Sequence, residues 1–229
     1  MLVAIHPIAK SSGLLAKFQL KIKSRKKSDE TIYNKINAVL FPKTATMTSS
    51  PVKSLNSQAV TTQHLPPLEN GDRLIRPEFE RRYQAMPGLK KAELIEGVVY
   101  MASPLRFKFH AEPHGRLITW LGVYQAATPQ VQMGIEPTVR LDIDNELQPD
   151  GVLLISQESG GKSTLTVEGY LEGAPELVVE IAASSAAIDL GDKKRAYRRS
   201  GIQEYLIWQV FDQKIDWFSL QDGDYISLL

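Results

Sequence analysis

The chain of 229 residues contains no cysteine. Disulfide bonds, thiolate zinc sites and cysteine nucleophiles are therefore excluded. Long apolar runs are also lacking: none approaches the roughly 20 residues that a membrane-spanning helix needs, and the first residues include His6, Lys10 and Lys17 in place of an uninterrupted apolar stretch. The 43% hydrophobic and 23% charged residues are typical of a globular protein. We therefore expect a cytoplasmic protein without membrane contact.

Acidic residues are scarce in the first part of the chain. Residues 1–65 contain ten Lys/Arg and two Asp/Glu, a net charge of +8, whereas residues 66–229 contain seventeen and twenty-four, a net charge of −7. Large apolar residues are scarce in residues 44–63, which are rich in Ser, Thr, Gln and Pro. Such a segment buries too little apolar surface to offset the entropy cost of folding. We predict a basic leader and linker over residues 1–66 and one folded domain over residues 67–229.

The basic leader has two interpretations. Its cluster of positive charge at residues 24–27 is typical of a nucleic-acid tether or a targeting arm. The alternative is a disordered extension, which is common among basic tails, and one form of it is an overlong start with Met47 as the natural initiator. The sequence leaves both interpretations open.

Helical spacing of apolar residues is found in three segments of the predicted domain. Residues 76–86 predict a short first helix. A second helix is expected to begin at Pro113 and to end before Thr128-Pro129, with one apolar face. A third helix is expected over residues 189–199, ending at Gly201.

Segments typical of β-strands surround these helices. Residues 92–102 predict a hairpin with its turn at Glu96-Gly97. Further strands are predicted at residues 138–143, 151–155, 177–182 and 204–210, and a second hairpin at residues 214–228. Because residues 177–182 are apolar except at one position, we expect this strand at the centre of the sheet, buried on both faces. The order of elements indicates an α/β fold.

Glu180 is the exception within the apolar strand at residues 177–182. A carboxylate there is costly unless a cation or a hydrogen-bond partner satisfies it. A second carboxylate, Asp150, stands at the start of the strand at residues 151–155. If the two strands are neighbours, two hard oxygen ligands meet at one edge of the sheet, which suits Mg²⁺ or Mn²⁺. The alternative is structural, with Asp150 in a turn and Glu180 paired with an arginine.

Lys193 is expected on the first turn of the third helix, just after the Glu180 strand. It is one of five basic residues within residues 189–199. A lysine in this place could project toward a metal, where it would stabilise developing negative charge or orient a water molecule. The alternative is a solvated helix face with ion pairs four residues apart.

Two further patterns resemble known motifs and are set aside. Residues 156–163 end in Gly-Lys-Ser like a phosphate-binding loop, but the β-branched, glycine-rich segment that follows is not helical, so the phosphate cradle is incomplete. His110 and His114 have the spacing of a helical zinc pair, but a helix beginning at Pro113 does not include His110. We therefore expect neither a nucleotide site nor a paired zinc site, and interpret His114 as a helix-start hydrogen bonder.

Five blocks in fixed order carry a family resemblance: AELIEG, PHGRL, QPDGVLLI, APELVVEI and DLGDKKRAYRRSGIQEYLIW. In this order they resemble the Uma2-type (DUF820) family of restriction endonucleases, which belongs to the PD-(D/E)XK nuclease superfamily. The resemblance covers residues 71–229. It implies a restriction-endonuclease-like core, in which a central mixed β-sheet flanked by helices is preceded by a β-hairpin.

The resemblance also implies a set of site residues. Asp150 and Glu180 match the metal-binding pair, and Lys193 matches a lysine supplied from the following helix. Glu93 matches an additional acidic residue near the site. His114 matches the family's histidine at the start of the helix after the hairpin, so all five are candidate catalytic residues.

Two functions of different classes follow. The first is an Mg²⁺- or Mn²⁺-dependent endonuclease that hydrolyses phosphodiester bonds, with nucleic acid, expected to be DNA, as its partner. The second is a nuclease-like fold without catalysis that acts as a binding or regulatory module. The feature that separates them is Ala182, which stands where the lysine of an E-x-K motif would be. A homodimer is expected by analogy with the superfamily.

Overall fold

The structure is a computed structural model that describes residues 65–228. The leader predicted for residues 1–66 therefore lies, up to residue 64, outside the described residues. The helices are α3 (Arg76–Gln84), α4 (Glu112–Ala127), α5 (Ala186–Ile188) and α6 (Lys194–Arg199), with π-helical turns at Phe107–Ala111 and Asp189–Lys193 and a 3₁₀ turn at Gln157–Ser159. The strands are β1 (Ala92–Ile95), β2 (Val98–Met101), β3 (Val131–Ile135), β4 (Val139–Arg140), β5 (Glu146–Leu147), β6 (Gly151–Ile155), β7 (Thr164–Leu165), β8 (Leu171–Glu172), β9 (Leu177–Ala182), β10 (Glu204–Gln209), β11 (Lys214–Gln221) and β12 (Asp224–Ser227).

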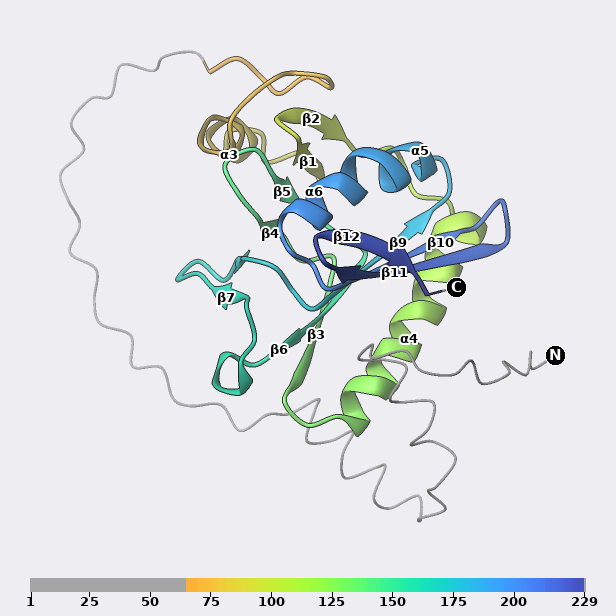
Figure 1. Cartoon of the computed structure of the whole chain (residues 1–229). Coiled ribbons are helices and arrows are strands. Elements are labelled where there is room, and N and C mark those ends of the chain that lie inside the picture. Colours follow the sequence, from red (N-terminus) through yellow and green to blue (C-terminus); the bar gives the residue numbers. More distant parts are fainter. Residues whose placement is uncertain (1–64, 229) are drawn as a thin grey trace.

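The strands form two six-stranded sheets (Figure 1). One sheet contains most of the longer strands, in the order β12-β11-β10-β9-β6-β3. The other sheet contains the first hairpin, and its order is β2-β1-β5-β4-β8-β7. The first of these sheets is mixed, because β9 runs parallel to β10 whereas its neighbours pair antiparallel. The predicted α/β fold, a central mixed sheet flanked by helices and preceded by a β-hairpin, is confirmed.

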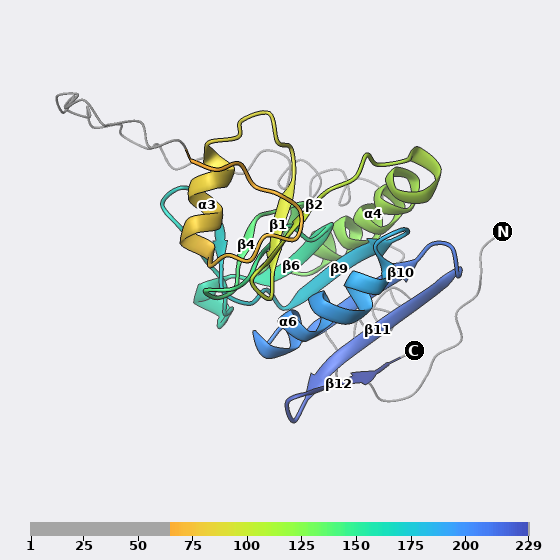
Figure 2. The same cartoon turned by 90° about the horizontal axis from the view of Figure 1, so that it is seen from above.

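Strand β9 lies at the centre, with helices on both of its faces (Figure 2). Successive side chains of a strand point to opposite faces. Val179 belongs to the apolar cluster that contains Leu121 of α4, whereas Val178 belongs to the cluster that contains Tyr197 of α6. All six residues of β9 are buried, as predicted. Glu180 therefore projects, like Val178, toward α6.

Two tight turns confirm both predicted hairpins. Glu96 and Gly97 connect β1 to β2 with φ angles of 52° and 74°. Asp222 and Gly223 connect β11 to β12 with φ angles of 51° and 87°. Two successive positive φ angles are the signature of a type I′ turn, whose twist matches that of the flanking strands.

The strand predicted at residues 138–143 is shorter in the structure, where β4 covers only Val139–Arg140. The chain turns directly afterwards, because Asp142 accepts hydrogen bonds from the Asp144 N–H and the Asn145 amide. Aspartate side chains stabilise turns in this way and compete with strand pairing. Strands β3, β5, β7 and β8 were not predicted, and all but β3 are only two residues long.

The helix that contains His114 begins earlier than predicted. A π-helical turn, Phe107–Ala111, runs directly into α4, and Pro113 occupies one of the first two positions of the α-helical part. A proline is tolerated there because the first helical N–H groups have no intrahelical partner. His110 and His114 therefore lie on one helical run, and the expectation that a helix break separates them was wrong.

No helix within residues 65–228 has the length and apolar character needed to cross a membrane.

Candidate active site

Asp150 and Glu180 lie opposite each other at the end of the ladder between β6 and β9. The antiparallel register pairs Gly151 with Val179, so the next pair outward is Asp150 with Glu180. Directly opposite residues of an antiparallel pair project to the same face. Beyond this pair a side chain takes the place of a backbone partner: the Ile181 N–H donates to Asp150 Oδ2 at 2.6 Å. The two strands are neighbours, and their carboxylates meet at one edge.

Gly151 allows helix α4 to approach this edge. A Cβ atom at Gly151 would lie 2.9 Å from Val179 Cγ2 and 3.0 Å from Ile118 Cδ1 of α4, so a larger residue would crowd these two side chains. With the helix this close, His114 Nε2 lies 2.8 Å from the backbone oxygen of Asp150. Asp150 thus supplies the carboxylate, and the absence of a side chain at Gly151 lets α4 pack close enough for His114 to contact the Asp150 backbone.

Glu180 is 2% exposed, and the α6 side of the sheet compensates its charge. Its Oε1 accepts hydrogen bonds from Lys193 Nζ at 2.9 Å and from the Tyr197 hydroxyl at 2.9 Å. Burial raises the pKa of Glu180 to about 8, although the nearby ammonium group of Lys193 acts against this rise. The partners of Glu180 are therefore Lys193 and Tyr197, and not the arginine of the structural alternative.

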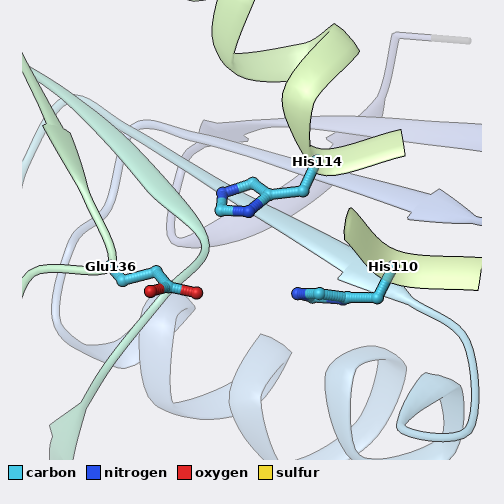
Figure 3. Close-up of side chains that lie close together, drawn as sticks. All are labelled: His110, His114 and Glu136. Atoms are coloured by element: carbon cyan, nitrogen blue, oxygen red, sulfur yellow. The ribbon is translucent and has the colours of Figure 1, made fainter. Parts of the chain in front are cut away.

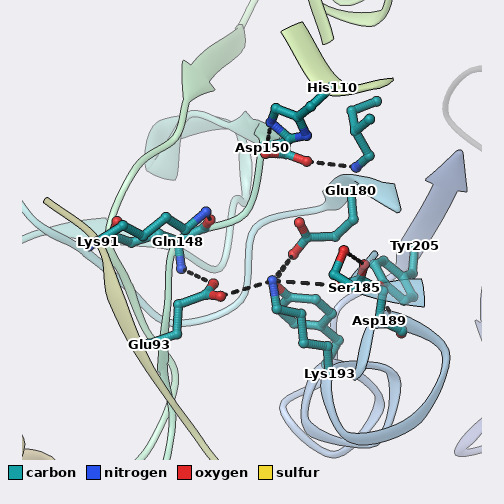
Figure 4. A network of polar contacts seen from close by, with 12 residues as sticks. Lys91, Glu93, His110, Gln148, Asp150, Glu180, Ser185, Asp189, Lys193 and Tyr205 are labelled. Atoms are coloured by element: carbon teal, nitrogen blue, oxygen red, sulfur yellow. Dashed lines mark hydrogen bonds and ion pairs between the residues drawn. The ribbon is translucent and has the colours of Figure 1, made fainter. Parts of the chain in front are cut away.

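Lys193 lies at the centre of three carboxylates (Figure 4). Its Nζ is 2.9 Å from Glu180 Oε1, 3.1 Å from Glu93 Oε2 and 3.6 Å from Asp189 Oδ1. Burial alone would lower the pKa of this ammonium group, but the surrounding negative charge raises it well above the usual value. The surrounding carboxylates therefore favour the charged form of Lys193 inside the protein.

Glu93 connects the two sheets at this point. It lies in β1, and its Oε1 accepts a hydrogen bond from the Gln148 N–H at 2.8 Å while its Oε2 faces Lys193. Lys91 Nζ donates to the Gln148 carbonyl oxygen at 2.7 Å. Glu93 and Lys91 of the hairpin segment thus hold the backbone of Gln148, two residues before Asp150.

His110 faces the other side of Asp150. Its Nε2 lies 3.3 Å from Asp150 Oδ1, and the imidazole is 12% exposed. The carboxylate raises the pKa of His110, since a negative charge favours the imidazolium form. Burial alone would raise the pKa of Asp150, but His110 and the Ile181 N–H lower it below the usual value.

The two strand carboxylates have a donor set that fits a hard divalent cation. Each has one oxygen held by protein donors: Asp150 Oδ2 by the Ile181 N–H, and Glu180 Oε1 by Lys193. The hydrogen bonds among residues 65–228 leave Glu180 Oε2 without a donor, and Asp150 Oδ1 contacts the ring of His110. Carboxylate oxygens in this arrangement are the ligands that Mg²⁺ and Mn²⁺ prefer.

The charge balance of the cluster also favours a cation. Glu93, Glu180 and Asp189 surround the single buried lysine, and a fourth buried carboxylate, Asp150, lies opposite Glu180. Like charges at short distance repel one another, and a bound cation removes this repulsion. Asp150 and Glu180 are therefore the residues that would hold a divalent ion here.

The five site residues predicted from the sequence lie in one region of the structure. Three more residues that sequence reasoning missed belong to it: Asp189, Tyr197 and, as a neighbour of Asp150, His110. Asp189 and Tyr197 each lie four residues from Lys193, the spacing that places side chains on one helix face. This spacing could have identified them once Lys193 was a candidate.

The glycine-rich loop at residues 156–163 differs from a phosphate-binding loop, as predicted. It leads into strand β7 instead of a helix. Backbone N–H groups at its two ends are engaged by a carboxylate: Glu176 accepts from Ile155 at 2.8 Å and from Lys162 at 3.3 Å. A phosphate would therefore meet a negative charge where it needs donors.

Comparisons with known proteins agree with this fold. The family model described as "Uma2: Putative restriction endonuclease" matches residues 76–228. The crystal structure of a "putative nuclease belonging to DUF820" from Anabaena variabilis ATCC 29413 is similar with a TM-score of 0.50 and 13% identity, covering 64% of this chain and 82% of that chain. At this identity the likeness concerns the fold, and it confirms the expected nuclease-like core. A search of curated proteins found no match. Because the family model matches more than half of the chain, the chain belongs to the Uma2 family.

Proposed function

We propose that the protein is an Mg²⁺- or Mn²⁺-dependent endonuclease that hydrolyses phosphodiester bonds in DNA. The observation that carries the proposal is the register of β6 and β9, which places Asp150 opposite Glu180 so that the two carboxylates lie on one face at the end of the ladder. Membership of a family described as restriction endonucleases supports nucleic acid as the substrate. The homodimer expected from the resemblance stays a prediction.

Each residue has a defined part in this proposal. A divalent ion held by Asp150 and Glu180 would polarise the scissile phosphate and lower the pKa of an attacking water. Lys193 places a fixed positive charge beside Glu180, where it would stabilise negative charge developing on the phosphate. Glu93 and Asp189 hold the Lys193 ammonium group in position. His114 fixes the backbone of Asp150 through its hydrogen bond to the carbonyl oxygen.

The basic residues of α6 contribute less to DNA binding than their number indicates. Arg195, Arg198 and Arg199 form ion pairs with Asp192, Asp224 and Glu96, respectively. Affinity for DNA depends on cations that are available to phosphates. We therefore infer that the basic leader, with its net charge of +8 over residues 1–65, supplies many of the phosphate contacts.

A second candidate function is supported by one observation. Ala182 occupies the position of the E-x-K lysine, and the lysine that replaces it is already engaged by three carboxylates. A site of this kind is compatible with a nuclease-like binding module without catalysis. Binding of DNA without metal-dependent cleavage would favour this function.

The test is cleavage of supercoiled plasmid DNA by the full chain, with and without Mg²⁺ or Mn²⁺. We expect cleavage that requires metal and is lost in Asp150→Ala and in Glu180→Gln. Lys162→Ala in the glycine-rich loop is the matched control and should cleave like the wild type. Cleavage that persists in Asp150→Ala, or that is the same without metal, would contradict the proposed site.

A further inference from the structure

A second group of metal-ligating side chains lies on the far side of Asp150 from Lys193. His110, His114 and Glu136 each offer one ligand atom, and these atoms all lie within 4.8 Å of one another. Within residues 65–228 this is the one group of three such residues with this geometry. Figure 3 shows the two imidazole rings and the carboxylate turned toward a common point. The three residues come from the π-helical turn, the start of α4 and the residue after β3.

The hydrogen bond of His114 leaves one ring nitrogen available for a metal. Its Nε2 lies 2.8 Å from the carbonyl oxygen of Asp150. A carbonyl oxygen only accepts, so Nε2 carries the proton and Nδ1 of the neutral ring keeps its lone pair. Histidine ligands of metals typically donate their other N–H to a backbone carbonyl, which fixes the tautomer and the orientation of the ring. His114 therefore has the arrangement of a metal ligand.

His110 has a buried nitrogen without a hydrogen bond. Within residues 65–228 its Nε2 makes no hydrogen bond of regular geometry, and it faces Asp150 Oδ1 in an ion pair at 3.3 Å. A buried polar atom without a hydrogen bond is costly and calls for a specific explanation. The rings of His110 and His114 are 5.5 Å apart between centroids, because one helical turn separates them. Coordination of a shared ion would satisfy this nitrogen.

Glu136 completes the group with a carboxylate at the solvent side. Its φ angle is 48°, a left-handed conformation that is unfavourable for a residue other than glycine. The Glu136 N–H donates to the Asp150 carbonyl oxygen at 3.3 Å, the same oxygen that His114 contacts. One backbone carbonyl thus holds both the ring of His114 and the backbone of Glu136. Strained backbone at non-glycine residues is often found at functional sites.

We propose that His110, His114 and Glu136 bind a first-row transition metal ion such as Zn²⁺, at a site separate from the Asp150–Glu180 pair. Two imidazoles and one carboxylate favour such ions over Mg²⁺ and Ca²⁺, which prefer oxygen ligands alone. Three protein ligands leave coordination positions open for water or a substrate oxygen, as in catalytic zinc sites and unlike closed structural ones. The site does not depend on whether the protein cleaves DNA.

The test is metal binding by the full chain after removal of bound metal with a chelator. Isothermal titration with Zn²⁺ should give one saturable equivalent, and Co²⁺ should give visible absorption bands of a site with nitrogen and oxygen ligands. The chain contains no cysteine and only two other histidines, His6 and His64, so competing sites are few. We expect His114→Gln, which keeps a donor for the carbonyl, and Glu136→Gln each to weaken Zn²⁺ binding at least about 10-fold.

Two control variants distinguish this site from the alternatives. Glu180→Gln removes a ligand of the strand carboxylate pair, and His6→Ala/His64→Ala removes the other histidines; both should bind Zn²⁺ like the wild type. Loss of binding in either control, with binding kept in His114→Gln, would overturn the proposal. Absence of a saturable equivalent in the wild type would overturn it as well. Because Glu136 is exposed, its variant should fold, and a melting curve of each variant checks this.

Discussion

Lys193 reaches Glu180 from a helix thirteen residues further along the chain, with its Nζ 2.9 Å from Oε1. On the strand itself, the position two residues after Glu180 holds Ala182, which is 1% exposed. Residues two apart share one face of a strand, so Ala182 lies on the same face as Glu180 and packs in the apolar cluster that contains Tyr197. Tyr197, one helical turn after Lys193, donates to the same oxygen. The orientation of Glu180 is thus set by the helix that packs over its strand.

Replacing Glu180 by glutamine should separate metal binding from structural pairing. The variant keeps an oxygen that can accept from Lys193 and Tyr197 but loses a charge whose ionisation burial opposes, with a pKa of about 8. A raised folded pKa means that stability is lost as pH rises toward that value. At pH 8 we therefore expect the metal-free variant to melt higher than the wild type. Mn²⁺ should raise the melting temperature of the wild type, by binding the folded state, and leave the variant unchanged.

The opposite pattern would contradict a metal site at Glu180. A glutamate with a purely structural role would make the variant less stable without metal, because loss of a buried ion-pair partner costs several kcal/mol. If the wild type also gains nothing from Mn²⁺, the ion pair with Lys193 is the whole function of Glu180.

Glu146 should give the protein a second pH dependence, remote from the metal pair. Burial and the carboxylate of Glu80 raise the pKa of Glu146 from 4.5 to about 7, although Arg140 acts against the rise. Between these two values the folded protein binds the proton more tightly than the unfolded chain, so the free energy of unfolding falls as pH rises. Glu146→Gln cannot ionise and should lose this contribution. Urea titrations between about pH 4.5 and 7 should show the variant gaining stability relative to the wild type as pH rises.

A matched control makes the result specific. Glu158→Gln removes a carboxylate from the exposed 3₁₀ turn and should follow the wild type across the same range. If Glu146→Gln also follows the wild type, folding does not shift the pKa of Glu146. If the variant loses stability relative to the wild type as pH rises, Arg140 holds Glu146 ionised in the folded protein and the expected sign is wrong.

Removal of the leader should affect DNA binding and leave folding intact. We expect a truncated chain beginning at Pro67 to melt within about 5 °C of the full chain, because a larger fall corresponds to roughly a kcal/mol or more. Without the positive charge of residues 1–65, the remaining −7 should weaken DNA binding and flatten its dependence on salt concentration. A larger fall in melting temperature would show that the leader docks on the domain, and unchanged affinity would place the phosphate contacts elsewhere.

The central sheet could be predicted from the sequence because its strands carry strong local signals. Residues 151–155 and 177–182 are apolar runs of ordinary strand length, and the structure keeps both boundaries. A charged residue in or next to such a run is conspicuous, which is why Asp150 and Glu180 were identified. The two-residue strands β5, β7 and β8 carry no periodic signal, since their pairing is determined by tertiary contacts.

The contacts around Lys193 and His110 could not be predicted in the same way. Glu93 lies in the other sheet, and no local pattern indicates that two sheets meet at one ammonium group. The sequence places His110 outside the helix that contains His114, because Pro113 is a strong local signal for the start of a helix. The π-helical turn before α4 overrides that signal and aligns His110 with His114.

The lysine beside Glu180 comes from the helical segment after the strand, and not from the strand itself. Lys193→Ala removes the cation that three buried carboxylates share, and loss of one partner from such a cluster should cost about 3–5 kcal/mol. Ala182 lies on the same face of the strand as Glu180, and its Cα is about 6.6 Å along the strand from that of Glu180. The flexible stem of a lysine can cover this distance.

We therefore expect Lys193→Ala/Ala182→Lys to recover part of the stability that Lys193→Ala loses, and part of any metal-dependent cleavage. Ala182→Lys alone should be destabilising, because it adds a second cation to a closely packed site that Lys193 already fills. Urea titrations of the four proteins form a double-mutant cycle, in which a favourable coupling between the two positions supports a lysine shared between strand and helix. If the effects simply add, Lys193 acts through its place in the helix, beside Asp189 and Tyr197, and a lysine on the strand cannot replace it.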